Sequence, residues 1–363
     1  MVQRGRGQLS RSAPVPQPAT GWSEVRPGLW IGGHVRFGVF LVSGRFPGQA
    51  DGDVLRRSVR AAELAEDAGF DDVWFAEHHF MPYGVCPSAI TLAAHVLGRT
   101  SRIGVGTAVS VLSTTHPVAL AEQWAMLDAV SGGRLRLGVG RGGPWQDLEV
   151  FGTGLDRYET GFEEALDVFL RATTGRVDAR GRHFAFREVP VVPGPERRPD
   201  VVVACGGPKS DAVRQAAERD LPLLLGLHAD DEEKAETVAA YGKPANHIST
   251  VLCQVGDADV VRKALPGWLK DGLGAHVTVD GRPGPGRDPG EYTERLCAIH
   301  PVGDAAHCVR TLETSLRRTG VSHVLMLVEA SGTPEGTFEN IARIGTEVLP
   351  ALRASSPAVP GSG

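Results

Sequence analysis

The amino-acid sequence predicts an α/β fold, a (β/α)8 TIM barrel with insertions at the C-terminal face of the barrel. Two observations lead to this prediction. From residue 35 onward, short apolar runs alternate with amphipathic stretches, and eight strand–helix units can be counted along the 363 residues. This alternation is typical of parallel sheets built from β-α units. No long linker interrupts the units, and right-handed crossovers then favour closure into a barrel over the alternative, an open doubly wound sheet.

The first half of the chain contains the most regular units. Residues 36–42 (RFGVFLV) are apolar on both faces, as expected of a parallel strand buried between two layers. Residues 54–69 follow with apolar residues at helical spacing, and Gly69 is placed to end the helix. The cycle then recurs, with strands expected within 71–80, 102–112 and 134–140 and helices within 88–98 and 116–133.

The second half keeps the alternation less regularly. Strands are expected within 200–205, 221–227, 247–256 and 323–328, and helices within 159–175, 209–220, 230–242, 257–270, 304–320 and 337–353. Two stretches break the pattern. Residues 175–199 contain an alternating segment that predicts a small hairpin, and residues 271–298 are too rich in Gly and Pro for regular structure. We expect both at the C-terminal face, where the active sites of this fold lie and where a long loop can serve as a lid.

Composition narrows the classes of partner. Lys and Arg number 38 against 43 Asp and Glu, which leaves a net charge of −5 and no positive field for nucleic acid or an anionic membrane. The five cysteines are odd in number and never spaced as C-x-x-C, so they predict neither a disulfide framework nor a metal site. No apolar run reaches the roughly 18 residues that span a bilayer, and no secretory signal is evident. These features favour a cytoplasmic protein.

The ends of the chain differ from its middle. Residues 1–34 are rich in Arg, Gly, Pro and Ser and show no periodicity. They are interpreted as a disordered extension, a remnant of cloning, or upstream sequence translated from too early a start. The predicted barrel domain covers residues 35–353, and residues 354–363 are expected to form a disordered tail.

A histidine pair follows the second predicted strand. His78 and His79 come directly after Glu77, and imidazole side chains suit acid–base chemistry near neutral pH. Adjacent residues on extended backbone point to opposite sides, so the two histidines are not expected to share a metal ion. One of them should face the mouth of the barrel; the alternative is that both only form hydrogen bonds within the loop.

Two Gly-rich stretches are candidates for anion binding. Arg141 leaves the fourth strand within GVGRGG (138–143), where it could bind a phosphate through two hydrogen bonds or form a surface ion pair. The stretch ACGGPKS (204–210) places Gly206, Gly207 and Lys209 between a strand and a helix N-terminus. Backbone amides and a cation at such a position suit phosphate, and a plain helix cap is the alternative.

Several long segments together resemble the luciferase-like flavin monooxygenases, most closely the α subunit of bacterial luciferase. They are DVWFAEHHF, LGRTSRIGVGTAVSVLSTTHPVALAEQWAMLDAVSGGRLRLGVGRG, DLEVFGTGLDR, AERDLPLLL and IHPVGDAAHC, in that order, and the resemblance runs from residue 35 to about 353. It implies a TIM barrel that binds reduced FMN, delivered by a separate NAD(P)H-dependent flavin reductase. The reduced flavin would react with O2 through a flavin hydroperoxide, in a pocket that excludes water.

The resemblance also assigns roles to single residues. His78 matches the catalytic histidine of the family, His79 its neighbour, and Asp147 an acidic residue of the active site. Ala108 and Val109 fall where the family has a cis peptide bond beside the flavin ring.

At the phosphate end of the site the chain departs from the family. Arg141 matches a phosphate-binding arginine, whereas a second such arginine aligns with Glu159, and Arg157 lies close enough in sequence to substitute for it. Two further phosphate contacts of the family become Cys205 and Gly206, and Lys209 replaces a threonine. We therefore expect the phosphate to remain bound, with charge supplied by Lys209 and Arg157 as well as by Arg141.

Two other departures concern the substrate. Gly140 stands where luciferase carries a reactive cysteine, and the segment at 271–298 has the position of the luciferase lid but is shorter and richer in Gly and Pro. These differences favour a substrate of another shape. The leading hypothesis is a two-component monooxygenase that inserts one oxygen atom into a long-chain aldehyde or, equally, into a natural product such as a polyketide intermediate of secondary metabolism.

Two other functions stay open at this point. Relatives of this barrel use a deazaflavin, so a deazaflavin-dependent dehydrogenase or reductase is one alternative. A non-catalytic flavin-binding subunit is the other. We also expect a homodimer, because members of the family pair through helices near their first strands, and the apolar helix LAEQWAMLDAV (120–130) could contribute a face; the same residues could instead only cover the barrel.

Overall fold

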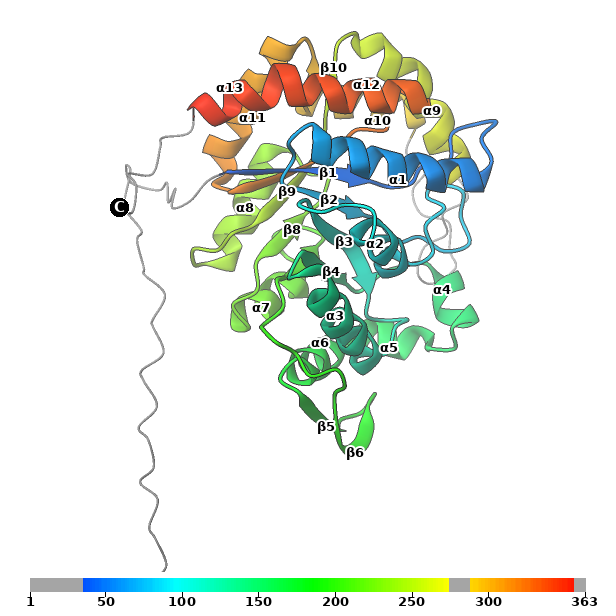
Figure 1. The fold of residues 1–363 in the computed structure, drawn as a ribbon, viewed down its shortest axis with the longest axis vertical. Helices are drawn as coiled ribbons and strands as arrows, with labels where there is room; N and C mark the ends of the chain where they lie inside the picture. Colours follow the sequence, from blue (N-terminus) through cyan, green and yellow to red (C-terminus); the bar gives the residue numbers. More distant parts are fainter. Residues whose placement is uncertain (1–34, 274–287, 356–363) are drawn as a thin grey trace, which may run out of the picture. The chain divides into compact units, whose positions relative to one another are not determined.

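The computed structural model describes residues 35–273 and 288–355. Eight parallel strands close into a barrel in the order β1-β12-β9-β8-β7-β4-β3-β2 (Figure 1). The strands are β1 Arg36–Leu41, β2 Asp72–Phe75, β3 Gly104–Val111, β4 Leu135–Gly140, β7 Val201–Cys205, β8 Leu223–Leu225, β9 Ile248–Leu252 and β12 His323–Leu327. Because β1 pairs in parallel with both β2 and β12, the sheet has no free edge, and the predicted (β/α)8 barrel is confirmed.

Helices follow the strands and cover the outside of the barrel (Figure 1). They are α1 Asp51–Asp67, α2 Ala89–Leu97, α3 Pro117–Ser131, α6 Phe162–Ala172, α7 Asp211–Glu218, α8 Asp231–Tyr241, α11 Ala305–Thr319 and α12 Pro334–Arg343. The last helix continues through a π-helical turn, Ile344–Val348, into α13, Leu349–Ser355. Among the described residues, no helix is long and apolar enough to cross a membrane.

Extra elements follow the strands at the C-terminal face. They are the short helices α4 Trp145–Val150 and α5 Gly154–Thr160 after β4, then β10 Gln254–Val255, α9 Ala258–Leu273, α10 Pro289–Ile299 and β11 Val302–Gly303 after β9. The prediction that residues 271–298 lack regular structure is wrong at both ends, because α9 runs to Leu273 and α10 packs against it. The middle of that stretch lies outside the described residues, as do residues 1–34 and most of the predicted tail.

The predicted hairpin is confirmed, but the expectation that it follows a strand is wrong, because it follows α6. Strands β5 Arg176–Arg180 and β6 Ala185–Pro190 pair in antiparallel fashion. They connect the end of α6 to the start of β7, and a helix-to-strand connection reaches the N-terminal end of its strand. The hairpin therefore starts at the N-terminal end of the barrel and runs back beside α6 (Figure 1). Phe184, in its turn, contacts His116 of the loop after β3 and Arg157 of α5, so the turn reaches the C-terminal face.

Large apolar side chains fill the barrel interior. Trp74, Leu325, Ile248, Leu224 and Val202 form one buried cluster contributed by five different strands. The indole of Trp74 has room because its neighbour on β3 is Gly106, where a β-carbon would lie 2.2 Å from Trp74 Cδ2. A larger cluster packs the helices onto the outer side of the strands, and this burial supplies most of the driving force for folding.

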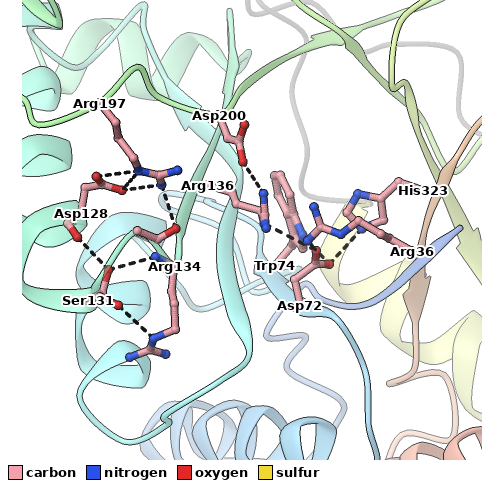
Figure 2. A network of polar contacts seen from close by, with 11 residues as sticks. Arg36, Asp72, Trp74, Asp128, Ser131, Arg134, Arg136, Arg197, Asp200 and His323 are labelled. Atoms are coloured by element: carbon pink, nitrogen blue, oxygen red, sulfur yellow. Dashed lines mark hydrogen bonds and ion pairs between the residues drawn. The ribbon is translucent and has the colours of Figure 1, made fainter. Parts of the chain in front are cut away.

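A buried carboxylate closes the N-terminal end of the barrel. Asp72, at the start of β2, forms hydrogen bonds with Trp74 Nε1 at 2.9 Å and with His323 Nε2 at 3.0 Å, and it pairs with Arg36 (Figure 2). The Nε of Arg136 lies 3.8 Å from Oδ2 of Asp72. Burial by itself would raise the pKa of Asp72, but His323 and the two arginines hold that pKa below its usual value.

A second buried carboxylate organises the opposite end. Glu329 follows β12 and accepts hydrogen bonds from the backbone N–H groups of Val42 at 2.7 Å, Ser43 at 3.2 Å and Gly44 at 3.3 Å. Its other main partner is the buried guanidinium of Arg57, on α1, at 2.6 Å. The pair fixes the loop from β1 to α1, at the end of the barrel where the candidate site lies.

Candidate active site

Glu77 anchors the loop that carries the two histidines. One of its carboxylate oxygens accepts a hydrogen bond from the N–H of Ala89, at the start of α2, at 2.9 Å. The other accepts from the N–H of Val111, at the end of β3, at 3.3 Å. Both oxygens are thus tied to neighbouring elements, so the direction in which the loop leaves β2 is fixed.

His78 lies against an aromatic stack. Its backbone N–H donates to the carbonyl of Cys86 at 2.9 Å, and its ring meets the ring of Tyr83 edge-on, with centroids 5.0 Å apart. Tyr83 stacks on Trp268 of α9 at 4.5 Å, and burial raises the pKa of Tyr83 well above its usual value. These surroundings exclude water from one side of the His78 ring.

His79 contacts a different set of residues. Its Nε2 lies 3.8 Å from a carboxylate oxygen of Glu77, and its ring meets Phe151 edge-on at 4.9 Å. Asp147, in the first turn of α4, is buried, and its Oδ1 has no hydrogen-bond partner among the described residues. Burial raises the pKa of Asp147, whereas the charge of His79 lowers it. Glu77, His79 and Asp147 therefore lie close enough together to influence one another electrostatically.

A cavity of about 660 Å³ opens between β3, β4 and α7. Its lining includes six of the nine predicted cofactor-binding residues, namely Val109, Gly140, Arg141, Cys205, Gly206 and Lys209. Ala108 and Gly207 are the chain neighbours of two of them. The peptide bond between Ala108 and Val109 is cis, as the family resemblance predicts. The structure thus brings two distant stretches of sequence, 138–143 and 204–210, to one cavity.

The cation-bearing end of the cavity lies beside the N-terminus of α7. Ser210 caps this helix by accepting a hydrogen bond from the N–H of Ala212 at 3.3 Å. Arg141 lies over the ring of Tyr158, with its guanidinium carbon 4.5 Å from the ring centroid. Neither Arg141 nor Lys209 forms an ion pair with any residue in the described part of the chain. Both cations are therefore available to an anionic ligand.

Arg157 does not lie in this cavity. Its guanidinium donates to the carbonyls of Leu112 at 3.3 Å and Thr115 at 3.0 Å, and it covers the ring of Phe184 at 4.8 Å. Burial lowers the pKa of Arg157. The side chain ties α5 to the loop after β3, which leaves its predicted part in phosphate binding without support from its position.

Comparison with known proteins connects this geometry to a family. The family model described as luciferase-like monooxygenase matches residues 35–323, about four fifths of the chain. The chain belongs to the luciferase-like monooxygenase family. The predicted family and the predicted enzyme class, a luciferase-like flavin monooxygenase, are thereby confirmed.

Individual relatives of this luciferase-like monooxygenase agree with the assignment. The alkanal monooxygenase alpha chain of Photorhabdus luminescens is 27% identical over 352 residues, which cover 88% of this chain and 98% of the relative. Two solved structures share the fold. The FMN complex of the oxygenating constituent of 3,6-diketocamphane monooxygenase, from Pseudomonas putida, has a TM-score of 0.71 at 16% identity and covers 87% of this chain and 98% of its own. An F420-dependent secondary alcohol dehydrogenase has a TM-score of 0.68 at 18% identity, with coverage of 88% and 99%.

Several residues of the cavity in this luciferase-like monooxygenase were not predicted from the sequence. Asp211, Arg214 and Gln215 line it from one face of α7. Their spacing of three and four residues was the available signal, because such residues share one side of a helix. Glu159 also lines the cavity, although the sequence predicts for it only that it replaces a phosphate-binding arginine of the family.

A smaller pocket of about 170 Å³ is lined in part by His79. Glu77, His79, Thr114, Gln123 and Phe151 are among its lining residues. The pocket brings polar side chains of α3 and of the loop after β3 next to the His79 ring. In this luciferase-like monooxygenase, none of the three predicted catalytic residues, His78, His79 and Asp147, is among the described residues that line the 660 Å³ cavity. The structure therefore does not bring the predicted catalytic residues into one lining with the predicted cofactor-binding residues.

Proposed function

We propose that this protein is the oxygenating component of a two-component monooxygenase. It would use O2 and reduced FMN, supplied by a separate NAD(P)H-dependent flavin reductase, to insert one oxygen atom into an organic substrate. The observation that carries the proposal is the 660 Å³ cavity, in which the unpaired cations Arg141 and Lys209 share one lining with Val109 and Gly140. This volume lies within the range of pockets that bind cofactors.

The residues of the cavity fit FMN. Arg141 and Lys209 would hold its phosphate, together with the backbone around Gly206 and Gly207 next to the α7 N-terminus. Val109 and Gly140 would present an apolar and a small group to a flat ring, and Cys205 lines the same cavity. Ala108 precedes Val109 across the cis peptide bond. Burial raises the pKa of the Cys205 thiol to about 11, so it remains protonated at neutral pH. When bound, reduced FMN supplies the electrons that activate O2.

The chain itself would control water and protons around the reacting atoms. The stack of Tyr83 and Trp268 excludes water from one side of His78, which is the proposed catalytic histidine. Asp147 retains its proton to a higher pH than an exposed aspartate because it is buried. We propose that His79 exchanges that proton and that Glu77 positions the His79 ring.

The substrate is proposed to be a long-chain aldehyde or a natural product such as a polyketide intermediate. The test supplies the purified chain with FMN, a flavin reductase, NADH and isotopically labelled O2, together with a panel of aldehydes, ketones and aromatic polyketides. One labelled oxygen atom in a product supports the proposal. Release of hydrogen peroxide alone with every substrate contradicts it, and light emission with decanal supports the aldehyde.

A deazaflavin-dependent dehydrogenase is the second candidate, because the fold is shared with an F420-dependent secondary alcohol dehydrogenase. The two cofactors can be separated by titrating the protein with FMN and with the deazaflavin while following cofactor fluorescence. Binding of the deazaflavin but not of FMN would favour the second candidate. A non-catalytic subunit would be indicated if the chain bound flavin but transferred oxygen to no substrate, whereas unchanged oxygen transfer by His78→Ala would refute the proposed role of His78.

We further propose that two copies of the chain associate in the cytoplasm. On α3, Leu120 and Trp124 are buried against the barrel, whereas Met126 and Val130 are exposed. Phe80 and Phe151, whose ring centroids lie 5.8 Å apart, are exposed as well. Light scattering on a size-exclusion column should give twice the mass of one chain, and Val130→Asp should reduce it to that of one chain.

A further inference from the structure

An unpaired carboxylate lies in the cation-bearing cavity. Glu159, on α5, lines the cavity together with Arg141 and Lys209 and is exposed. It has no hydrogen bond or ion pair with any residue in the described ranges. Its neighbour Glu163 differs, because its carboxylate pairs with Arg214 at 3.5 Å and with Arg219 at 3.2 Å.

The free charges of the cavity nearly cancel. Arg141 and Lys209 are unpaired cations, whereas the guanidinium of Arg214 is held by Glu218 at 2.8 Å. Two carboxylates without an ion pair in the described part of the chain, Glu159 and Asp211, line the same cavity. Only the dipole of the eight-residue helix α7 then remains as a net positive contribution.

We propose that Glu159 is a specificity-determining residue that weakens the attraction of this cavity for a phosphate dianion. The inference rests on the proposed function, since it assumes that a flavin phosphate binds here. With Glu159 ionised, FMN gains little from its phosphate, and the ring and ribityl chain supply most of its affinity. The cavity then discriminates weakly between FMN and riboflavin, and FMN is released readily for exchange with a reductase.

The size of the effect follows from Coulomb's law. A unit negative charge that shares a water-filled cavity with a phosphate changes the affinity by about threefold to tenfold at ordinary ionic strength. Riboflavin carries no phosphate, so its affinity should not respond. The ratio of the two dissociation constants therefore isolates the charge effect from any general change in the pocket.

The experiment measures the dissociation constants of oxidised FMN and of riboflavin by flavin fluorescence, using the full chain without reductase or substrate. Glu159→Gln should tighten FMN binding by about threefold to tenfold and leave riboflavin binding unchanged, and Glu159→Arg should tighten FMN binding further. Lys209→Gln should change the ratio in the opposite direction. Glu196→Gln is the matched control, because Glu196 is exposed, without an ion pair in the described residues, and outside the cavity lining.

The outcomes separate the two proposals. If wild type binds both flavins and Glu159→Gln leaves the ratio of dissociation constants as in wild type, the role of Glu159 is refuted while flavin binding stands. If wild type binds neither FMN nor riboflavin, the proposed function fails and the role of Glu159 fails with it. If Glu159→Gln tightened the binding of FMN and of riboflavin by a similar factor, the inference would also be overturned. Such a result would show that the substitution changes the shape of the cavity and not its charge toward phosphate.

Discussion

The backbone of Gly140 lies so close to the side chain of Val109 that a β-carbon at residue 140 would stand 2.7 Å from Val109 Cγ2. The residues belong to neighbouring strands and line the same cavity. Val109 is β-branched and cannot turn away freely. Gly140 thus keeps the wall of the cavity where it is, in addition to lacking the thiol expected from the family.

Gly140→Ala should therefore deform the cavity wall. Overpacking of this kind costs about 1–3 kcal/mol of unfolding free energy, and we expect FMN affinity to fall by roughly tenfold as Val109 moves. Urea unfolding and flavin titration measure the two effects. Gly143→Ala is the control, since a β-carbon there meets no atom within 4 Å; equal behaviour of the two variants would contradict the prediction.

Removing Arg57 should destabilise the protein strongly. Arg57→Met leaves the buried carboxylate of Glu329 without its ion-pair partner, a loss that costs about 3–5 kcal/mol. Urea unfolding gives the free energy. Arg176→Met, which breaks the exposed pair with Glu188, should cost about 1 kcal/mol or less. A small effect at Arg57 would mean that the three backbone N–H groups alone satisfy Glu329.

Asp72 should make stability depend on acid pH. Its pKa is lowered in the folded protein, so its contribution is present above the unfolded value near about 3.9 and is lost as the pH falls through the folded value. Asp72→Asn should lose about 3–5 kcal/mol at pH 7, and the difference from wild type should shrink in strong acid. Asp200→Asn, at the exposed partner of Arg136, should change stability little at either pH.

Asp147 should make stability depend on pH in the opposite direction to Asp72. Its pKa is raised by burial, so its contribution is full below the unfolded value and is lost as the pH rises through the folded value. Asp147→Asn cannot ionise and should unfold a few degrees above wild type at pH 7 and close to wild type at about pH 3. The same variant should lose oxygen transfer.

Glu149→Gln, an exposed change on the same helix, serves as the control for thermal unfolding. If Asp147→Asn were less stable than wild type at pH 7, the carboxylate would have to be stabilised in the folded protein, contrary to its burial without a partner at Oδ1.

The barrel could be predicted from the sequence because its strands are apolar on both faces and its helices keep their period. The path of residues 175–199 could not be predicted, because the prediction places the segment after a strand, whereas it follows the helix α6 and runs back beside it. The prediction of one continuous helix within residues 159–175 was wrong at its N-terminal end for a local reason. Gly161 separates α5 from α6, and one helix had been expected across that position.

In the candidate site, the sequence could predict which stretches of the chain line the cavity. It could not predict which side chains within those stretches point into it. Arg157 and Glu159 are two residues apart on one short helix, yet Arg157 binds backbone carbonyls outside the cavity and Glu159 lines it. Which of the two points inward depends on how α5 packs against the loop after β3. That packing is a tertiary property, so no spacing rule within the segment could have revealed it.

Strand β2 has only four residues, with Asp72 at its start and the histidine loop directly after its end. Asp72, which stabilises the fold, thus lies at one end of this short strand, and the histidines proposed to take part in the reaction follow its other end. A mutant library confined to the segments after the strand ends should alter substrate range while most of its members still fold. Randomisation around Asp72 should instead yield insoluble protein, whatever substrate is screened.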